Sequence, residues 1–373
     1  MPELVLYRKY RPKTFKEIVG QEHVVRTLTN ALKLDRVAHA YLFTGPRGTG
    51  KTTIARLLAK AINCENREGF EPCNRCPSCL EINENRALDL IEIDAASNRG
   101  IDEIRELRDG IKFTPTRLKY KVFIIDEVHM LTKEAFNALL KTLEEPPSHA
   151  VFVLATTEIH KVPQTIISRC QRFDFVKIPV LKIIERLKFI CEREKINIED
   201  EALKLIALQG DGALRDSEGL LGQISVLYTQ NRPQNQITLK DVQDFLGVAD
   251  ISTVSKLVDL ISSKKLSEAI FHINQVMDNG YDIIQFTKHL IGYFHKMMLL
   301  RVDPNLYRLA APELTEEQFN VIIKQGKNFS SSDLNKILRI LVDTENEMKF
   351  SNPPQLPLEL AIIEIIGLSE DAS

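Results

Sequence analysis

Short apolar runs alternate with helical patterns along the first half of the chain. Candidate strands lie at residues 40–44, 88–94, 121–126, 150–156 and 172–176. Two of these segments contain uninterrupted apolar residues, at 122–125 and 151–154, which is typical of parallel strands covered on both faces. Because helical patterns such as 53–63 and 133–143 lie between the strands, we predict a doubly wound α/β domain.

The strand signal ends after Pro179. Residues 180–195 place apolar side chains on one helical face, and further helical patterns follow at 200–209 and 214–229. A polar segment at 232–236 interrupts the pattern, and helical patterns then return at 252–263, 265–278, 282–300, 315–324, 332–348 and 357–366. We therefore predict three domains: an α/β domain over 1–179, a small helical lid over 180–243 and a helical domain over 244–373.

Composition limits the function without identifying it. The chain has 373 residues, 44% of them hydrophobic and 27% charged, which suits a globular protein of two or three domains. Its net charge of −2 creates no overall attraction for nucleic acid or an anionic membrane, so any DNA contact needs a local basic patch. No basic and apolar leader opens the chain, and the apolar stretch at 356–368 is short and interrupted, so we expect no secretory signal and no membrane span.

One segment matches the phosphate-loop pattern G-x-x-x-x-G-K-[ST]: Gly45, Pro46, Arg47, Gly48, Thr49, Gly50, Lys51 and Thr52. A predicted strand precedes it, and a predicted helix beginning at Thr53 follows, as this motif requires. Glycines let backbone N–H groups turn toward phosphates, Lys51 supplies a positive charge, and the Thr52 hydroxyl is a ligand for Mg²⁺. The helix N-terminus favours anions as well. We therefore predict a nucleotide site over residues 45–53, against the competing interpretation of a chance glycine turn.

Two acidic residues follow the apolar strand at 121–126. Asp126 would hold Mg²⁺ through water, and Glu127 would polarise the attacking water as a general base. Such a pair is usually a solvated strand end, but we expect this strand to neighbour the one that leads into the phosphate loop. Thr157, at the end of the next strand, is our candidate for orienting the attacking water, with an ordinary strand-end threonine as the alternative.

A group of four cysteines separates the phosphate-loop helix from the next strand: Cys64, Cys73, Cys76 and Cys79. Four thiolates within 16 residues suit one tetrahedral ion, and the segment has little apolar sequence of its own, so bound zinc would supply its folding energy. An iron–sulfur cluster is the competing interpretation, although the position of the upstream cysteine favours zinc. Clustered rather than paired cysteines also indicate a reducing, cytoplasmic environment.

The order of these motifs resembles that of AAA+ clamp loaders. The resemblance rests on the phosphate loop, the acidic strand end, Ser168-Arg169-Cys170, the segment 212–216 (Gly-Ala-Leu-Arg-Asp) and the opening segments 7–12 and 19–22. Together with the cysteine group, the whole chain is similar to the gamma/tau subunits of bacterial DNA polymerase III. This resemblance implies an AAA+ domain, a zinc module, a lid and an all-α collar domain.

The resemblance also implies roles for individual residues. Four residues would border the adenine of ATP: Tyr10, Arg11, Pro12 and Val19. Arg169 would reach the ATP of a neighbouring subunit, and Arg215 would contact the γ-phosphate of its own subunit. An arginine supplied from a neighbour stabilises transition-state charge and makes hydrolysis depend on assembly. A surface ion pair is the alternative for each arginine.

Partners follow from the same resemblance. It implies a ring of five clamp-loader subunits joined by the collar, a sliding clamp, and primer–template DNA bound without sequence preference. Candidate contacts to the DNA backbone are Arg99, Arg105 and Lys141, although neighbouring acidic residues make a solvated mixed-charge face nearly as good an interpretation.

The leading functional hypothesis is an ATPase that opens a sliding clamp when it binds ATP and releases the clamp on primed DNA by hydrolysis. Two alternatives stay open: a nucleotide-binding scaffold subunit without turnover, and an AAA+ helicase that migrates branched DNA. The family's longer form continues beyond this sequence to bind polymerase and helicase, so we expect those activities to be missing here.

Overall fold

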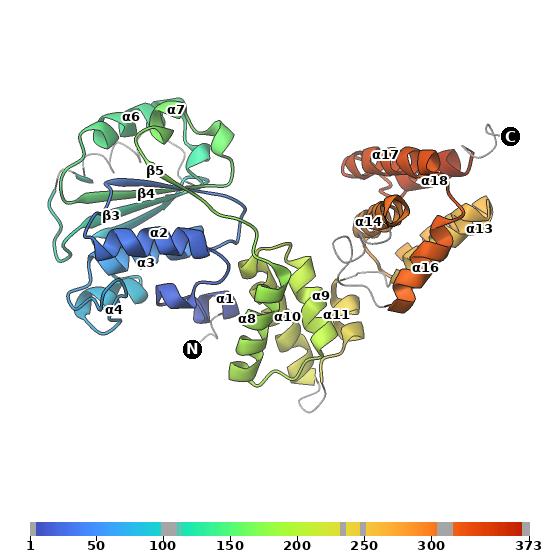
Figure 1. Cartoon of the computed structure of the whole chain (residues 1–373), viewed down its shortest axis with the longest axis horizontal. Coiled ribbons are helices and arrows are strands. Elements are labelled where there is room, and N and C mark those ends of the chain that lie inside the picture. The colour runs from blue at the N-terminus through green and yellow to red at the C-terminus, as the bar shows by residue number, and fades with distance from the viewer. Residues whose placement is uncertain are drawn as a thin grey trace. The chain divides into compact units, whose positions relative to one another are not determined.

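The computed structural model describes residues 5–97, 110–111, 113–231, 236–246, 251–303 and 316–367. The chain divides into two units, Met1–Leu239 and Lys240–Ser373, drawn in Figure 1. No helix among the described residues has both the length and the apolar character that a membrane span requires.

A five-stranded parallel sheet forms the centre of the first unit, in the order β2-β3-β4-β1-β5. The strands are β1 (Ala40–Thr44), β2 (Leu90–Asp94), β3 (Lys121–Asp126), β4 (Ala150–Thr156) and β5 (Gln171–Asp174). The predicted parallel sheet is therefore confirmed. Our expectation that the acidic strand neighbours the phosphate-loop strand is wrong, because β4 lies between β3 and β1. Chain order alone does not determine the order of strands in a sheet.

The two faces of the sheet bury separate sets of side chains. Successive residues of a strand point to opposite faces, so Tyr41 and Phe43 join one core while Ala40 and Leu42 join the other. The first core is completed by α2 (Glu22–Lys33) and α3 (Lys51–Ile62), and the second by α6 (Lys133–Glu144) and α7 (Gln164–Ile167). Figure 1 shows these helix pairs on opposite sides of the sheet.

Shorter elements complete the domain around the sheet. They are α1 (Leu6–Lys9), α4 (Pro77–Asn83) and the 3₁₀ turns Phe15–Glu17, Val128–Met130 and Ile159–Lys161. Helix α6 begins where it does because the Thr132 hydroxyl accepts a hydrogen bond from the Ala135 N–H, which satisfies one of the free N–H groups of the first turn.

Three helices follow the sheet within the same unit: α8 (Val180–Glu194), α9 (Asp200–Gln209) and α10 (Leu214–Asn231). The predicted apolar face of α8 buries Ile183, Leu187 and Ile190. Lys195, at φ 56°, then ends the helix in the left-handed region. Because these lid helices belong to the same unit as the sheet, a domain boundary at residue 179 stays a prediction.

The second unit is helical throughout its described residues. Helix α11 (Leu239–Leu246) begins at the junction, and α12 (Ile251–Ser262), α13 (Leu266–Asp278), α14 (Ile283–Val302), α16 (Glu316–Gly326), α17 (Ser331–Met348) and α18 (Leu356–Gly367) follow. The helices from α12 to α18 share one apolar core that includes Phe286, Leu290 and Phe294. Capping residues fix where two of these helices begin. Asp282 accepts hydrogen bonds from two backbone N–H groups of α14, and Ser330 forms a capping box with Asp333 on α17.

One buried carboxylate organises the entry to β3, the strand that carries the acidic pair. Asp89 is 2% exposed, and its oxygens accept hydrogen bonds from the backbone N–H groups of Thr116, Arg117 and Leu118 at 2.9, 2.8 and 3.0 Å. Burial raises the pKa of Asp89, but these N–H groups and Lys121 outweigh it, so the pKa is lowered overall. The carboxylate therefore ties the start of β2 to the loop before β3.

We predict that Asp89→Asn lowers the free energy of unfolding by about 1–3 kcal/mol at pH 7, the usual cost of unsatisfied buried N–H groups. Because the pKa of Asp89 is lower in the folded protein than in the unfolded chain, its carboxylate stabilises the fold fully at pH values above the unfolded pKa of about 4. This stabilisation is lost as the pH falls through the pKa of the folded state. The difference from wild type should therefore shrink in acid. Urea unfolding from pH 3 to pH 8 measures it, with the exposed Asp278→Asn as the matched control.

Candidate functional site

The phosphate loop joins the end of β1 to the start of α3. Gly45 has φ 142°, and a Cβ there would lie 2.2 Å from the Phe175 carbonyl oxygen. Gly48 has φ 76°, and a Cβ there would lie 2.7 Å from the Cβ of Ala213 on the lid. Only glycine fits at both positions, because φ is positive at each and a Cβ atom would collide with the neighbouring residue. The motif therefore shapes a loop that also approaches the lid and Phe175, the residue that follows β5.

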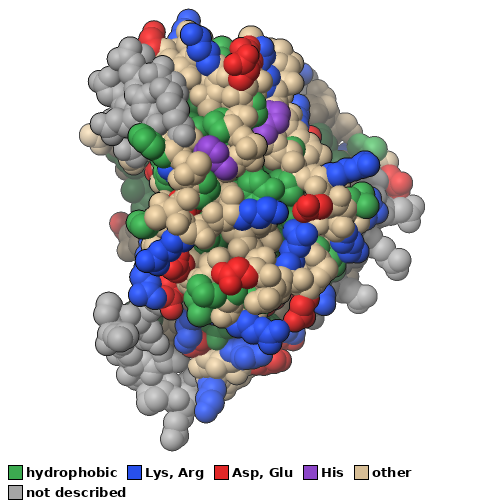
Figure 2. Space-filling view, turned by 90° about the vertical axis from the view of Figure 1, so that its left-hand side faces the viewer, with side chains coloured by type: hydrophobic (Ala, Val, Ile, Leu, Met, Phe, Trp, Pro, Cys, Tyr) green, Lys and Arg blue, Asp and Glu red, His purple; other side chains and the backbone are tan. Residues whose placement is uncertain are grey.

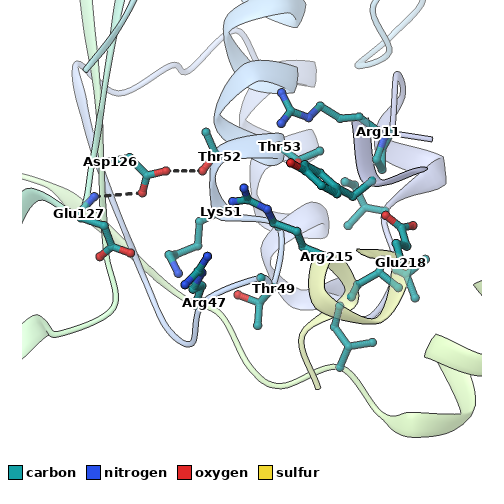
Figure 3. Close-up of a pocket in the computed structure, with 18 of the residues that line it drawn as sticks. Arg11, Arg47, Thr49, Lys51, Thr52, Thr53, Asp126, Glu127, Arg215 and Glu218 are labelled. Carbon is teal, nitrogen blue, oxygen red and sulfur yellow. Dashed lines mark hydrogen bonds between the residues drawn. The ribbon is translucent and has the colours of Figure 1, made fainter. Parts of the chain in front are cut away.

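Lys51 and Thr52 bring the loop's chemistry to the edge of the sheet. The Lys51 ammonium donates to the carbonyl oxygens of Gly45 and Pro46 at 2.7 and 2.8 Å, which holds it over the loop. Burial lowers the pKa of Lys51, while Glu127 and Asp126 oppose that shift. The Thr52 hydroxyl donates to Asp126 Oδ2 at 2.7 Å, a contact drawn in Figure 3. A hydroxyl and a carboxylate oxygen side by side form a suitable pair of ligands for Mg²⁺.

Glu127 lies beside the predicted water-orienting residue. Its Oε2 accepts hydrogen bonds from the Thr157 hydroxyl at 2.9 Å and from the Thr157 N–H at 3.2 Å. His129 places Nδ1 3.3 Å from the same oxygen and Nε2 3.3 Å from Glu158 Oε1. The Glu127 backbone has φ 48°, an uncommon left-handed conformation for this residue. Two neighbours, Thr157 and His129, therefore hold the carboxylate at the end of β3 through three contacts.

A cavity of about 470 Å³ opens beside the loop, and the lid closes one side of it. Predicted residues that line it are Arg11, Pro12, Val19, Arg47, Gly48, Thr49, Gly50, Lys51, Thr52, Thr53, Asp126, Glu127 and Arg215. Figure 3 shows Arg215 reaching from the lid toward the phosphate loop, and its backbone N–H donates to the Gly48 carbonyl at 3.4 Å. Loop, strand end and lid thus enclose one space.

Tyr10 is not among the residues that line this cavity. Its hydroxyl donates to Glu194, and its ring makes an edge contact with Phe189 on α8, with centroids 6.4 Å apart. Burial, together with Glu194, raises the pKa of Tyr10 to about 12. The structure therefore places Tyr10 as a contact between the N-terminal segment and the lid. Its role beside adenine stays a prediction.

Sequence reasoning missed three polar residues of the cavity, Tyr7, Asp94 and Glu218. The Arg215 guanidinium lies 4.9 Å from the centre of the Tyr7 ring, and a hydrogen bond with Arg215 lowers the pKa of Tyr7. Glu218 is 5% exposed, and burial raises its pKa to about 7 against the opposing effect of Arg186, whose Nε lies 3.4 Å from its Oε1. The spacing of three residues from Arg215 was a usable signal, because it places Glu218 on the same face of α10.

Arg169 does not line the cavity of its own chain. Its guanidinium pairs with Glu144 at the end of α6 and donates to the Thr165 carbonyl at 2.8 Å, and a third of its side chain is exposed. This position is compatible with action on another subunit. Of the candidate DNA contacts, Lys141 is an exposed residue of α6, whereas Arg99 and Arg105 lie outside the described residues.

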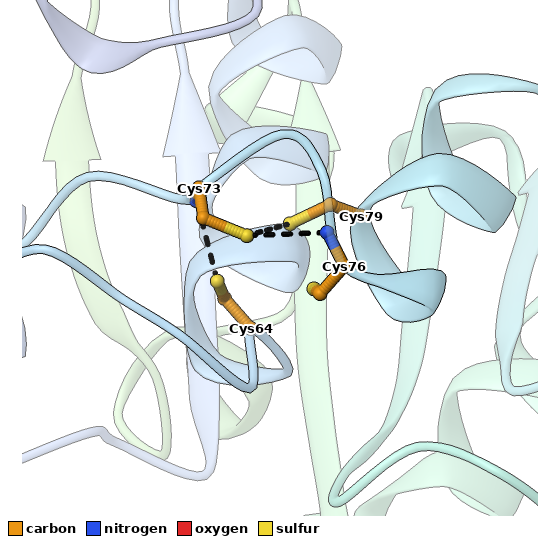
Figure 4. A group of neighbouring side chains, drawn as sticks. All are labelled: Cys64, Cys73, Cys76 and Cys79. Carbon is orange, nitrogen blue, oxygen red and sulfur yellow. Dashed lines mark hydrogen bonds between the residues drawn. The ribbon is translucent and has the colours of Figure 1, made fainter.

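The four predicted cysteines come together around a common centre (Figure 4). All four sulfur atoms lie within 4.8 Å of one another, close to the roughly 3.8 Å between thiolates that share a tetrahedral zinc ion. Backbone N–H groups point at the sulfurs, from Cys73 to Cys64 Sγ and from Cys76 to Cys73 Sγ, each at 3.3 Å. Burial raises the pKa of Cys73, but backbone N–H groups outweigh it and lower the pKa to about 6. The arrangement fits a closed metal–thiolate site.

The two remaining cysteines are far from this cluster in sequence. Burial raises the pKa values of Cys170 and Cys191 to about 12, as expected for thiols that serve packing. On the face shown in Figure 2, lysine and arginine side chains alternate with aspartate and glutamate rather than forming one large basic field. This mixed surface agrees with the net charge of −2.

Comparison with known families gives consecutive matches along the chain. Residues 20–179 match the model of the DNA polymerase III delta subunit, and residues 182–226 match the ATPase lid domain of the DNA polymerase III clamp loader subunit. Residues 237–372 match domain III of the DNA polymerase III subunits gamma and tau.

Curated relatives match nearly the whole chain. The DNA polymerase III subunit tau of Bacillus subtilis is 42% identical over 99% of this chain, which spans 64% of that protein. The DNA polymerase III subunit gamma of Buchnera aphidicola is 37% identical over 97% of this chain and 98% of that protein. The tau subunit of Escherichia coli is 37% identical, and this chain spans 55% of it.

Two solved structures are more distant. The Thermotoga maritima RuvB Holliday junction branch migration motor has 19% identity and a TM-score of 0.48, over 73% of this chain and 86% of that one. The Bacillus subtilis DNA clamp loader delta protein has 16% identity and a TM-score of 0.38, over 92% of this chain and 99% of that one.

We predict that the purified chain contains about one zinc ion and that Cys79→Ser loses most of it, because three thiolates bind zinc far more weakly than a closed set of four. Metal analysis by mass spectrometry measures the content, and thermal unfolding should show a lower midpoint for the variant. Cys170→Ser is the matched control. Bound iron, or full zinc in Cys79→Ser, would refute the zinc assignment.

We predict that Lys51→Ala weakens ATP binding by at least about 100-fold, because it removes two or more charge-assisted hydrogen bonds to phosphate, each of which contributes about 1.5 kcal/mol or more. Titration with a fluorescent ATP analogue measures the affinity. The exposed Lys336→Ala removes the same charge from the second unit and should bind ATP as wild type does. Unchanged affinity in Lys51→Ala would mean that ATP binds elsewhere.

Proposed function

Because this chain belongs to the gamma/tau family of DNA polymerase III subunits, we propose that it is an ATP-hydrolysing motor subunit of a clamp loader. The hydrogen bond between Thr52 and Asp126, with Glu127 adjacent, is the observation that most supports turnover rather than binding alone. It joins the residue types that hold Mg²⁺ to a candidate general base within one cavity.

Each residue has a distinct chemical task in this proposal. Backbone N–H groups of the loop and the Lys51 ammonium bind the β- and γ-phosphates of ATP. Thr52 and Asp126 would hold Mg²⁺, which would supply positive charge against the charge that develops during transfer. Glu127 accepts the proton of the attacking water. The Thr157 hydroxyl orients Glu127, with which it already makes a hydrogen bond of 2.9 Å.

The lid converts nucleotide binding into movement. Arg215 lines the cavity from α10, and its backbone is hydrogen-bonded to the phosphate loop. A γ-phosphate that attracts Arg215 would favour one lid position, and loss of that phosphate would release it. We propose that this motion, repeated around a ring of subunits, opens a sliding clamp on ATP binding and releases it on primer–template DNA after hydrolysis.

Arg169 is proposed to complete the site of a neighbouring subunit. It stands outside its own cavity and pairs with Glu144 in the single chain. A partly exposed ion pair of this kind contributes little stability, so exchanging Glu144 for a nucleotide phosphate costs little. The ring of five subunits, the DNA contact at Lys141 and the bound zinc belong to the same proposal.

Two alternatives are disfavoured by particular residues. A scaffold subunit without turnover has no need for the complete set of Lys51, Asp126 and Glu127. A branch-migration helicase has no evident use for the four-cysteine cluster, and the match of residues 237–372 to a gamma and tau domain favours the clamp loader.

We predict that ATP hydrolysis by this chain, assembled with its sibling subunits, is strongly stimulated by a sliding clamp together with primed DNA. Steady-state phosphate release with each component alone and with both measures the effect, and Glu127→Gln is the inactive control. Stimulation by branched DNA that is indifferent to the clamp would indicate the helicase. ATP binding without turnover would indicate the scaffold.

We predict that Arg169→Ala retains ATP binding but lowers turnover in the assembled complex by about 10³-fold, the usual contribution of an arginine supplied from a neighbour. ATP affinity of the isolated chain and phosphate release by the complex separate the two effects. Arg172→Ala, three residues away on β5 and paired with Asp174, is the control. Normal turnover by the Arg169→Ala complex would exclude the proposed role.

A further inference from the structure

A second cavity of about 390 Å³ lies next to the nucleotide cavity and is lined by cations. Its charged lining residues are Arg8, Arg11, Lys13, Arg56 and Lys60, and no aspartate or glutamate is among the described residues that line it. Arg11, Pro12 and Thr53 line both cavities. The nucleotide motifs do not account for this concentration of positive charge.

The cations of this cavity are only partly neutralised by the protein. Arg56 pairs with Glu92 at 2.5 Å and donates to Asn85, but its Nε is buried and makes no hydrogen bond with the described residues. The Arg11 side chain makes no hydrogen bond or ion pair with any part of the chain that the structure describes. Donors therefore remain that an anion can use.

Lys60 differs from its neighbours because its donors are already occupied. The side chain is 2% exposed, and its ammonium donates to the Lys13 carbonyl, Asn74 Oδ1 and Asn83 Oδ1 at 2.9, 2.6 and 2.9 Å. These three acceptors are neutral, although Cys79, Glu17 and Glu71 are near enough to favour the charged form of Lys60. Lys60 therefore contributes a fixed buried charge to the wall of the cavity.

The pKa of Arg11 reflects the positive charges gathered around it. Burial lowers the pKa of Arg11, and Arg56 is the next largest influence, also lowering it, while Glu92 opposes the shift. Like charges in a partly buried cavity repel one another, and a bound anion would remove this repulsion because it attracts each of them. Phosphate groups suit such sites because arginine binds them through two parallel hydrogen bonds.

We propose that this cavity is a second anion site, separate from the phosphate loop, that binds a phosphate group through Arg11, Arg56 and Lys13. Because Arg11 also lines the nucleotide cavity, an anion bound here changes the charge beside the bound nucleotide. Binding at the two sites is therefore coupled, and the coupling acts equally in both directions. A free polyphosphate and a nucleic-acid phosphodiester share this chemistry.

Inorganic pyrophosphate without Mg²⁺ is the probe, titrated calorimetrically into the full-length Lys51→Ala chain, in which the phosphate loop is disabled. We expect one binding event to persist. Adding Arg56→Gln should weaken it by about tenfold or more, as expected for the loss of a charge-assisted hydrogen bond. Lys13→Gln should weaken it as well, and Arg36→Gln, an exposed arginine outside the cavity, should leave it within about twofold.

The same titration in the presence of a short DNA duplex distinguishes the two sources of phosphate. Displacement of pyrophosphate by the duplex identifies a phosphodiester site, and indifference to the duplex identifies a site for small anions. Loss of all pyrophosphate binding in Lys51→Ala alone would overturn the proposal, because the phosphate loop would then be the whole site. Equal affinities in Arg56→Gln and Arg36→Gln, both folded by circular dichroism, would overturn it too.

Discussion

The candidate site depends on one hydrogen bond, 2.7 Å long, between the Thr52 hydroxyl on α3 and the Asp126 carboxylate at the end of β3. The phosphate loop follows β1, and β4 separates β1 from β3, so the two partners start about two strand spacings, roughly 9–10 Å, apart. The loop spans this gap because its glycines let the chain turn back over the edge of the sheet and begin α3 at Lys51. Parallel registry then aligns the strand ends, with Ile125 opposite Leu154 and Thr44 opposite Thr156. A slip of one residue in either pairing would separate the Mg²⁺ ligands, which is why the packed faces of the sheet matter to the chemistry.

The lid contacts the phosphate loop, so the cavity and the lid are not structurally independent. A Cβ at Gly48 would collide with Ala213, and the Arg215 backbone is hydrogen-bonded to Gly48. Arg215 also lies over the Tyr7 ring, and Leu6 on the same short helix is in contact range of Gly222 on α10. A phosphate that draws Arg215 toward the loop must therefore compete with Tyr7 for the guanidinium. Two discrete positions for one side chain are the physical requirement for the nucleotide-dependent switch that we propose.

Local patterns were sufficient for the parts of the site that lie within one segment. The glycines around Lys51, the acidic pair after an apolar strand and the spacing of the four cysteines each identify chemistry without knowledge of the fold, and the structure brings each group together. The sheet was predictable for the same reason, since two of its strands, β3 and β4, contain continuous apolar runs. Strand order was not, because it depends on crossover connections that leave no local trace. Tyr7 was missed because packing of the N-terminal segment against α8 and α10, which brings Tyr7 to the cavity, leaves no local pattern. Glu218 was missed although its spacing from Arg215 was a usable signal. The placement of Tyr10 beside adenine follows from the resemblance and stays a prediction.

Packing also explains why a cysteine module should accompany a nucleotide site. The Glu71 carboxylate within the module accepts hydrogen bonds from the backbone N–H groups of Phe15 and Lys16 at 2.9 and 3.0 Å, and Asn74 Nδ2 donates to the Lys13 carbonyl at 3.1 Å. These contacts hold the segment between Arg11 and Val19, whose two ends line the nucleotide cavity. The module itself has few apolar side chains, so its order depends on whatever joins its four sulfur atoms. A metal there would act at a distance from the phosphate loop, by fixing the strip of backbone that carries Arg11 and Val19 to the cavity.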